Sequence, residues 1–329
     1  MKKFINQVEL VEDQMIQGMV KAYPQYVRKL DCGNVVARTE KKEGKVALIS
    51  GGGSGHEPAH GGYVGTGMLD AAVAGAVFTS PTPDQIYEGI KAIATDKGVL
   101  MVIKNYTGDV MNFEMAGEMA QMDEIKVAQV VVNDDVAVDG SLYTVGRRGV
   151  AGTVFVHKIA GAKAEEGAEL EEVQRVAQKV IDNVRTMGVA IRPCTVPAAG
   201  KPGFELGEDE MEVGIGIHGE PGTHKEPLRP ADEIVDHILD KILADIDYTG
   251  HEVAVMVNSS GATPLMELFI INNHVADVLA AKGIRVYKTY VGEYMTSLEM
   301  EGFSVSLLRL DDELKALLDA HADTIAFKA

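Results

Sequence analysis

Short runs of apolar residues alternate along the chain with longer segments whose apolar positions recur every three to four residues. The short runs occupy residues 45–50, 98–104, 126–132, 251–257 and 284–291. Helical periodicity marks residues 11–27, 83–96, 110–122, 164–188, 231–246 and 265–283, and a strand followed by a helix is expected over 303–321. Because short apolar strands alternate with amphipathic helices, the pattern predicts an α/β fold with a largely parallel sheet.

One change in pattern divides the chain. Residues 164–188 begin with glutamates and end with basic residues, which suits the dipole of one long helix. Residues 192–210 then contain three prolines and little periodicity. A length of 329 residues is typical of two domains. We therefore expect two α/β domains, residues 1–188 and 189–329, each with a largely parallel or mixed sheet flanked by helices.

Composition and charge narrow the class of protein. The net charge is −18, and aromatic residues make up 5% of the chain with no tryptophan. Nucleic acids and anionic membranes bind basic surfaces, so neither is an expected partner. No apolar run reaches the roughly 18 residues of a membrane helix, and the N-terminus lacks the apolar core of a signal peptide. The distant cysteines Cys32 and Cys194 suit free thiols. We expect a cytoplasmic protein.

Three motif matches fail in their context. His56-Glu57-Pro58-Ala59-His60 fits the H-E-x-x-H string of zinc proteases, but that motif requires an unbroken helix and proline interrupts this one. Residues 214–219 fit G-x-G-x-x-G, yet they lie in a strand-like run and do not open a helix. Residues 198–203 lack the spacing of a phosphate loop. We therefore expect no metal and no nucleotide cofactor on this chain.

The first candidate site follows the strand at residues 45–50. The run after this strand contains Gly53, Ser54, Gly55 and His56. Glycines let a backbone approach a small ligand, and ligands bind at the carboxyl ends of strands in open α/β sheets. The alternative is a tight turn with a capping serine and a solvated histidine. The density of glycine beside a histidine favours function.

The second candidate follows the strand at residues 98–104. Lys104 ends this strand, and Asp109 comes five residues later. Asp109 alone is best explained as a cap of the helix that begins near Val110. If the strands are parallel, however, both side chains lie at the same sheet edge as His56, where a carboxylate near a histidine makes a general base.

The third candidate is His218, which ends an apolar run and precedes Gly219. The spacing leaves a structural and a functional role equally open. The roles of His60 and His224 also stay open. The remaining histidines are expected to be ordinary residues of helices and strand ends, namely His157, His237, His251, His274 and His321.

Long polar and glycine-rich strings extend this pattern over nearly the whole chain. They are SGGGSGHEPAHGGYVG, FTSPTPDQIYEGI, IKNYTGDVMNFEMA, DDVAVDGSLYTVGRRGVAGT, CTVPAAGKPGFEL, GIGIHGEPG and GATPLMEL. In this order they resemble the K subunits of the dihydroxyacetone kinase family. The resemblance implies phosphorylation of dihydroxyacetone, with the ketone held on His218 as a hemiaminal. It also implies that His56 and Asp109 are the acid and base.

The resemblance assigns the substrate pocket and the partners as well. Gly53, Ser54, Gly55 and Lys104 match positions that bind substrate in the family. The implied partners are a nucleotide-binding L subunit that carries ADP or ATP with Mg²⁺, a phosphotransferase M subunit that acts through L, and a second copy of this chain. The alternative is a catalytically idle K-like paralogue that binds dihydroxyacetone and co-activates a transcription regulator. His218 does not separate the two, whereas the joint presence of His56 and Asp109 favours the enzyme.

Overall fold

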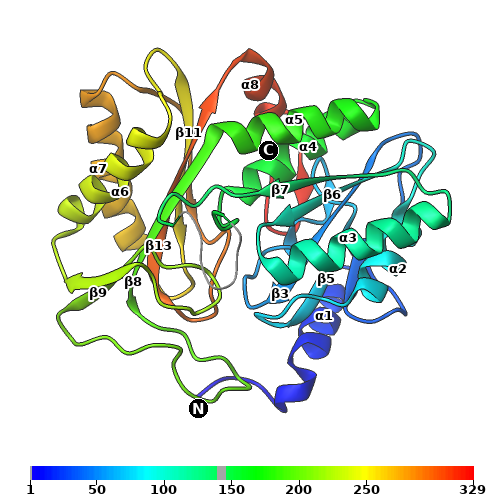
Figure 1. Ribbon diagram of the computed structural model, residues 1–329, viewed down its shortest axis with the longest axis horizontal. Helices are drawn as coiled ribbons and strands as arrows, with labels where there is room; N and C mark the ends of the chain where they lie inside the picture. The colour runs from blue at the N-terminus through cyan, green and yellow to red at the C-terminus, as the bar shows by residue number, and fades with distance from the viewer. Residues whose placement is uncertain (1, 139–145) are drawn as a thin grey trace.

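The computed structural model describes residues 2–138 and 146–329, which form alternating layers of helix and sheet (Figure 1). Helices α2 (Pro83–Ile93) and α3 (Thr107–Met122) cover one face of a first six-stranded sheet. Helices α4 (Thr153–Glu165) and α5 (Leu170–Asn183) lie between this sheet and a second one. The expected α/β class is confirmed.

The first sheet has the strand order β1-β2-β5-β3-β6-β7. Its strands are β1 (Val27–Lys29), β2 (Val35–Arg38), β3 (Ala47–Ser54), β5 (Ala71–Val77), β6 (Val99–Lys104) and β7 (Val127–Val132). The strands β5, β3, β6 and β7 are parallel to one another, and β1 and β2 pair in antiparallel fashion at the edge. The parallel half places the carboxyl ends of β3 and β6 side by side.

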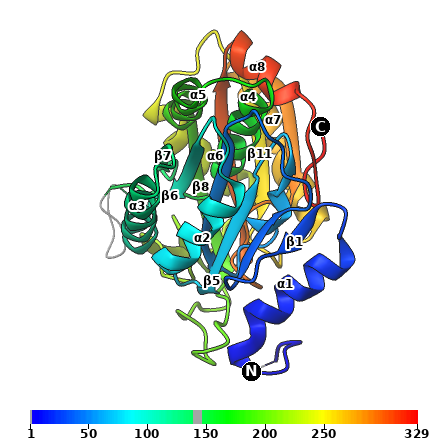
Figure 2. The same cartoon turned by 90° about the vertical axis from the view of Figure 1, so that its right-hand side faces the viewer.

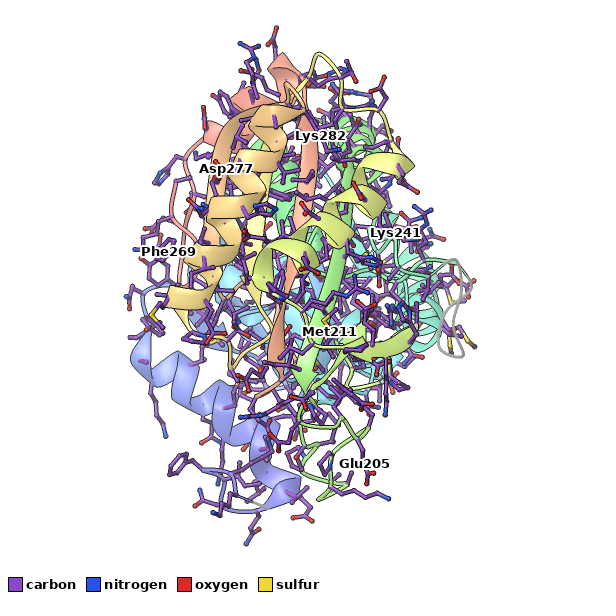
Figure 3. All side chains as sticks on the ribbon, turned by 90° about the vertical axis from the view of Figure 1, so that its left-hand side faces the viewer. Glu205, Met211, Lys241, Phe269, Asp277 and Lys282 are labelled. Carbon is purple, nitrogen blue, oxygen red and sulfur yellow. The ribbon has the colours of Figure 1, made fainter. Side chains whose placement is uncertain are left out.

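The second sheet has the order β10-β9-β8-β13-β11-β12 and is mostly antiparallel. Its strands are β8 (Val184–Arg192), β9 (Glu210–Val213), β10 (His224–Pro227), β11 (Glu252–Ser259), β12 (Arg285–Gly292) and β13 (Glu301–Leu310). Helices α6 (Ala231–Asp245) and α7 (Leu265–Ala281) lie side by side on its outer face (Figure 3).

The two halves share one apolar layer. Helix α8 (Asp312–Asp319) packs on α4, and the tail after it pairs through β14 (Asp323–Thr324) with β4 (Gly65–Thr66) of the first half. Helix α1 (Val11–Ala22) lies outside the first sheet near the N-terminus (Figure 2). The cluster of buried residues between the sheets therefore includes side chains from both ends of the chain.

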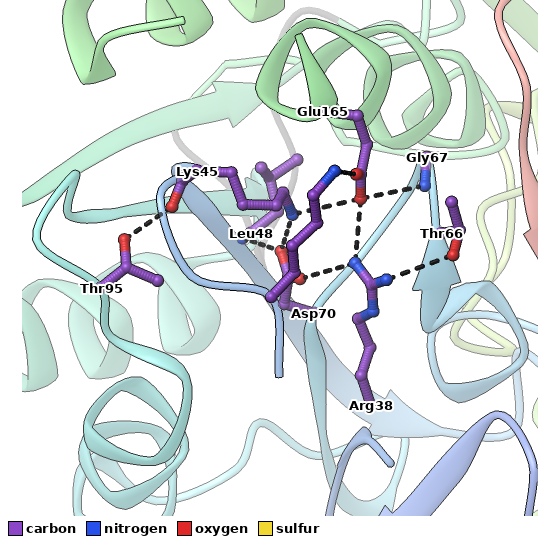
Figure 4. A network of polar contacts seen from close by, with 9 residues as sticks. Arg38, Lys45, Leu48, Thr66, Gly67, Asp70, Thr95 and Glu165 are labelled. Atoms are coloured by element: carbon purple, nitrogen blue, oxygen red, sulfur yellow. Dashed lines mark hydrogen bonds and ion pairs between the residues drawn. The ribbon is translucent and has the colours of Figure 1, made fainter. Parts of the chain in front are cut away.

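A buried network of charged side chains fixes the middle layer to the first sheet (Figure 4). Arg38 contacts Asp70 at 3.2 Å and Glu165, at the end of α4, at 2.9 Å. Lys45 is 1% exposed and lies 2.6 Å from Asp70. The backbone N–H of Leu48 donates to the same carboxylate at 2.8 Å. Each buried charge thus has an opposite partner, as a buried ion requires.

Several predicted boundaries were wrong. The single helix expected over residues 164–188 is divided, because α4 ends at Glu165, α5 spans Leu170–Asn183, and Val184 already begins strand β8. The strand expected at 45–50 continues through the glycines to Ser54. The predicted end of the first domain at residue 188 falls inside β8, and the division at that position stays a prediction. In the described part of the chain, no helix has both the length and the apolar character needed to cross a membrane.

Candidate active site

The parallel strands β3 and β6 bring two of the predicted segments together. Ser50 pairs with Val102, so the glycine turn after β3 and Lys104 at the end of β6 reach the same edge of the sheet. Glycine is required at position 52, where φ is +149° and an added Cβ would lie 2.4 Å from Lys104 Nζ. The close approach of the end of β3 to Lys104 thus depends on a missing side chain.

His56 is fully buried in this turn with a defined proton. Its Nδ1 lies 2.9 Å from the carbonyl oxygen of Thr296, which only accepts, so Nδ1 carries the hydrogen. Its Nε2 has no hydrogen-bond partner among the described residues. Burial, and then the nearby Lys104 charge, lower the pKa of His56 to about 3. His56 is therefore neutral at physiological pH and presents a free lone pair.

His218 meets His56 edge to face, with ring centroids 4.8 Å apart. The rings of Tyr106 and Phe78 also contact His218, at centroid separations of 4.1 and 5.6 Å. Burial, followed by interactions with the His56 ring and the Lys104 charge, lowers the pKa of His218 well below its usual 6.5. An aromatic enclosure that keeps an imidazole neutral also keeps it nucleophilic.

Asp109 lies in the first turn of α3 and is 1% exposed. The interpretation of Asp109 as a helix cap was wrong, because α3 begins at Thr107 and its N-cap residue is Tyr106. Oδ2 of Asp109 lies 3.6 Å from Lys104 Nζ, and Oδ1 has no hydrogen-bond partner among the described residues. Burial raises the pKa of Asp109, and Lys104 opposes that shift. Asp109 Oδ1 is therefore free to accept a proton, as a general base does.

A cavity of about 550 Å³ opens beside these groups. Its lining includes Asp109, Tyr106 and His218, together with Val196 and Gly203 from the proline-rich segment that was predicted to be irregular. The structure thus brings Asp109 and His218, which are far apart in the sequence, to one cavity, with His56 packed against His218 and Lys104 beside Asp109.

Contacts from both halves hold the His218 turn and the His56 turn in place. The carboxylate of Glu220 accepts from the backbone N–H of His218 at 2.8 Å, and its other oxygen lies 3.3 Å from the buried Arg148. Arg148 also contacts Asp135, which follows strand β7 of the first sheet, at 2.6 Å. Thr296 in turn bonds to the backbone around His56. The site is therefore assembled by bridges between the two sheets.

Three predicted residues shape the backbone of the site. A Cβ on Gly53 would lie 2.6 Å from Phe78 Cα, and one on Gly55 would lie 2.8 Å from the Phe78 ring. The Ser54 hydroxyl donates to the Gly75 carbonyl inside the sheet at 2.7 Å. The two glycines thus let the Phe78 segment pack closely against the end of β3, and the predicted contact of all three residues with substrate stays a prediction.

Two of the rejected motifs lack the helix that their function would require, although the strand-like run expected at residues 214–219 was wrong because β9 already ends at Val213. Residues 57–60 form a turn, and the two histidines of H-E-x-x-H have different partners, since His60 faces Lys104 and His157. Residues 214–219 connect β9 to β10 and open no helix. His224 lies on β10 with its side chain half exposed, 3.9 Å from Glu226.

Sequence reasoning missed the residues that enclose and hold the histidines. These residues act through contacts between distant segments, for which the sequence holds no local signal. They are Phe78, Tyr106, Arg148, Glu220 and Thr296. His157 was expected to be an ordinary helix residue and instead bonds to His60 in the buried interior at 2.9 Å.

Comparison with known proteins decides the family. The family model of the Dak1 domain matches residues 17–326. The chain belongs to the Dak1 family. A Dak1 relative from Listeria innocua, named PTS-dependent dihydroxyacetone kinase 1, dihydroxyacetone-binding subunit DhaK, is 56% identical over 329 residues, which cover 99% of this chain and 100% of the relative.

Two solved structures share the Dak1 fold closely. The dihydroxyacetone kinase of C. freundii superposes with a TM-score of 0.93 at 35% identity, covering 99% of this chain and 60% of that one. A protein described as the dihydroxyacetone kinase operon co-activator Dha-DhaQ superposes with a TM-score of 0.89 at 37% identity, covering 95% of this chain and 97% of that one. A dihydroxyacetone kinase and an operon co-activator thus share this fold.

Proposed function

We propose that this Dak1 chain is the dihydroxyacetone-binding subunit of a multi-subunit dihydroxyacetone kinase, with His218 as the covalent anchor. A ring nitrogen of His218 adds to the ketone carbon, and the carbonyl oxygen takes a proton as the hemiaminal forms. The ring N–H supplies that proton overall, so no atom leaves. A carbonyl is required for this step, so glycerol is excluded as a substrate.

Two buried atoms without a described partner serve one step each, Asp109 Oδ1 the phosphoryl transfer and His56 Nε2 the addition. The substrate hydroxyl attacks the terminal phosphorus of a nucleoside triphosphate, its proton passes to Asp109 Oδ1, and the diphosphate leaves. An aspartate plays this part in other kinases. His56 Nε2 is suited to exchange a proton with the substrate oxygens during addition. The nucleotide with Mg²⁺ is supplied by a separate L subunit, itself coupled to a phosphotransferase M subunit, and we propose no cofactor on this chain.

One observation carries this proposal. Asp109 Oδ1 and His56 Nε2 are buried without partners among the described residues, and His218 lies against His56 at the cavity that Asp109 lines. Buried polar atoms without partners are costly, and they are retained where a ligand uses them. The 56% identity to a subunit named for dihydroxyacetone binding supports the same substrate.

Two variants test the assignment of roles. With a cognate L subunit and a phosphoryl source, Asp109→Asn should keep the ketone adduct, seen as added mass on the intact protein, while phosphorylation falls about 100-fold or more. His218→Ala should lose both the adduct and turnover. Equal loss of adduct and turnover in Asp109→Asn would refute the assignment of Asp109 as the base.

The second candidate is a co-activator of transcription, favoured by the structural match to Dha-DhaQ. Both candidates bind the ketone, so binding does not separate them. Phosphorylation with any L subunit supports the kinase. Intact ketone binding without turnover, together with ketone-dependent binding to a transcription regulator, supports the co-activator.

We further propose that the chain pairs with a second copy. Helix α7 exposes Phe269 at 57% (Figure 3) and Met266 at 71%. The adjoining edge strand β12 exposes Val286 and Tyr287. An unpaired edge beside an apolar helix face is typical of an association surface. Light scattering should give a dimer that Phe269→Glu dissociates, and a monomeric wild type would refute this pairing.

A further inference from the structure

Behind Asp109, three buried polar side chains form a line that the proposed chemistry does not use. Lys104 Nζ lies 3.1 Å from His60 Nε2, and His60 Nδ1 lies 2.9 Å from His157 Nε2. Lys104 and His157 are fully buried and His60 is 6% exposed. The line crosses from β6 through the turn after β3 to α4 in the middle layer.

The protons of this line can be placed from its geometry. Burial lowers the pKa of the Lys104 amine, and Asp109 opposes that shift. Beside this carboxylate the amine is an ammonium with three N–H donors and no acceptor. One donor points to the Gly51 carbonyl at 3.2 Å, and another reaches His60 Nε2, which must therefore be an unprotonated acceptor. The His60 hydrogen is then on Nδ1 and is donated to His157 Nε2. In this arrangement both histidines are neutral Nδ1–H tautomers, and the Nδ1–H of His157 has no acceptor among the described residues.

The ammonium is held between His60 on one side and Asp109 on the other. The groups that face Asp109 are Lys104, the Ser80 hydroxyl and the Tyr106 phenol. Those that face Lys104 are Asp109, the Tyr106 ring at 5.9 Å and four neutral histidines, His56, His60, His157 and His218. Lys104 is therefore the positive charge that opposes the protonation of Asp109 in its buried position.

We propose that His60, oriented by His157, is a positioning residue that holds the Lys104 ammonium against Asp109 and thereby keeps Asp109 ionised for catalysis. The inference rests on the proposed function, in which Asp109 is the base. His60 itself touches neither substrate nor the transferred group.

This role predicts a specific change in the pH profile. Without an acceptor at position 60, the ammonium loses one of its buried hydrogen bonds, and its hold on Asp109 weakens. Burial then dominates at Asp109, whose pKa rises, so a larger fraction of the carboxyl is protonated at neutral pH. The acidic limb of the phosphorylation profile should therefore move to higher pH, with activity recovering in alkaline solution.

Two substitutions at one position separate this role from packing. His60→Leu fills space but offers no acceptor, and it should lower phosphorylation at pH 7 about tenfold or more while the His218 adduct still forms. His60→Gln places an amide oxygen near the position of Nε2 and should restore the wild-type limb. Circular dichroism and the adduct mass confirm that each variant is folded.

A second measurement is independent of turnover. Long-range ¹H–¹⁵N spectra of histidine-labelled wild type identify the tautomer of each ring, and the proposal requires Nδ1–H at both His60 and His157. This reading stands even if the wild type fails to phosphorylate dihydroxyacetone, in which case the proposed function fails by itself. If His60→Leu does not fold, the tautomers decide.

An Nε2–H tautomer at His60 would overturn the proposal, because that nitrogen would then be a donor to a neutral lysine. An unmoved acidic limb in His60→Leu would overturn it as well. Equal profiles for the leucine and glutamine variants would show that position 60 acts through packing alone.

Discussion

His157 offers a quantitative test of how the interior of this Dak1 protein is held neutral. Its side chain is fully buried, and burial, then the charge of Lys104, lowers its pKa from 6.5 to about 3. Between pH 6.5 and about pH 3, His157 is protonated in the unfolded chain and neutral in the folded chain. The contribution of His157 to stability is therefore complete above pH 6.5 and declines as the pH falls toward 3.

The magnitude follows from the two pKa values. A histidine that titrates at 6.5 when unfolded and at about 3 when folded lowers the free energy of unfolding by about 2 kcal/mol between pH 7 and pH 5. His157→Gln keeps an acceptor for His60 but cannot take up this proton. Between pH 7 and pH 5, the free energy of unfolding of the variant should therefore fall by about 2 kcal/mol less than that of the wild type.

Urea unfolding at pH 7, 6 and 5 measures this difference. Far-ultraviolet circular dichroism and tyrosine fluorescence are the suitable probes, since the chain has no tryptophan. The exposed His251, changed to glutamine, is the matched control for a histidine-to-glutamine substitution. Equal losses of unfolding free energy in wild type and His157→Gln would refute this assignment.

Glu165 does not interfere in this pH range. Burial raises its pKa, but Lys45, Lys42 and Arg38 outweigh burial and lower it to about 2. The contribution of Glu165 to stability is therefore lost only below pH 4.5.

Two further substitutions test the packing around the site. Asp70→Asn removes the nearer of the two carboxylates that pair with the buried Lys45 and leaves only Glu165 at 3.6 Å. It should cost about 3 kcal/mol in urea unfolding, much of which the double change with Lys45→Met recovers. An unaffected single variant would contradict the network. Gly52→Ala puts a Cβ at the Lys104 ammonium and should abolish phosphorylation. Gly18→Ala is the control, because its Cβ meets open space, and it should stay active. An active Gly52→Ala would contradict the close approach of Gly52 to Lys104.

The sequence was sufficient to predict the half of the site that depends on parallel strands. Because β3 and β6 are adjacent and parallel, polar residues that follow two apolar runs share one edge, as expected for His56, Lys104 and Asp109. His218 could not be placed by this rule. It reaches the same cavity through the bridge of Glu220 and Arg148 between the sheets, which no local pattern records.

The wrong helix over residues 164–188 has a similar cause. Its charged periodicity is genuine up to Asn183, where α5 ends. The chain then enters β8 without a loop, and Arg185 contacts Asp245 of α6 instead of completing a helix terminus. A basic residue that follows an acidic helix start suits the dipole of a single helix. The contact of Arg185 with Asp245 shows instead that this residue belongs to strand β8.

The central claim is that His218 holds the ketone covalently. A crystal structure of the wild-type chain with dihydroxyacetone tests this claim most directly. We predict continuous electron density from a ring nitrogen of His218 to the central carbon of the ketone, with the hydroxyl groups beside Asp109 and His56. Dihydroxyacetone bound without that bond, attached to another side chain, or absent from the cavity would contradict it.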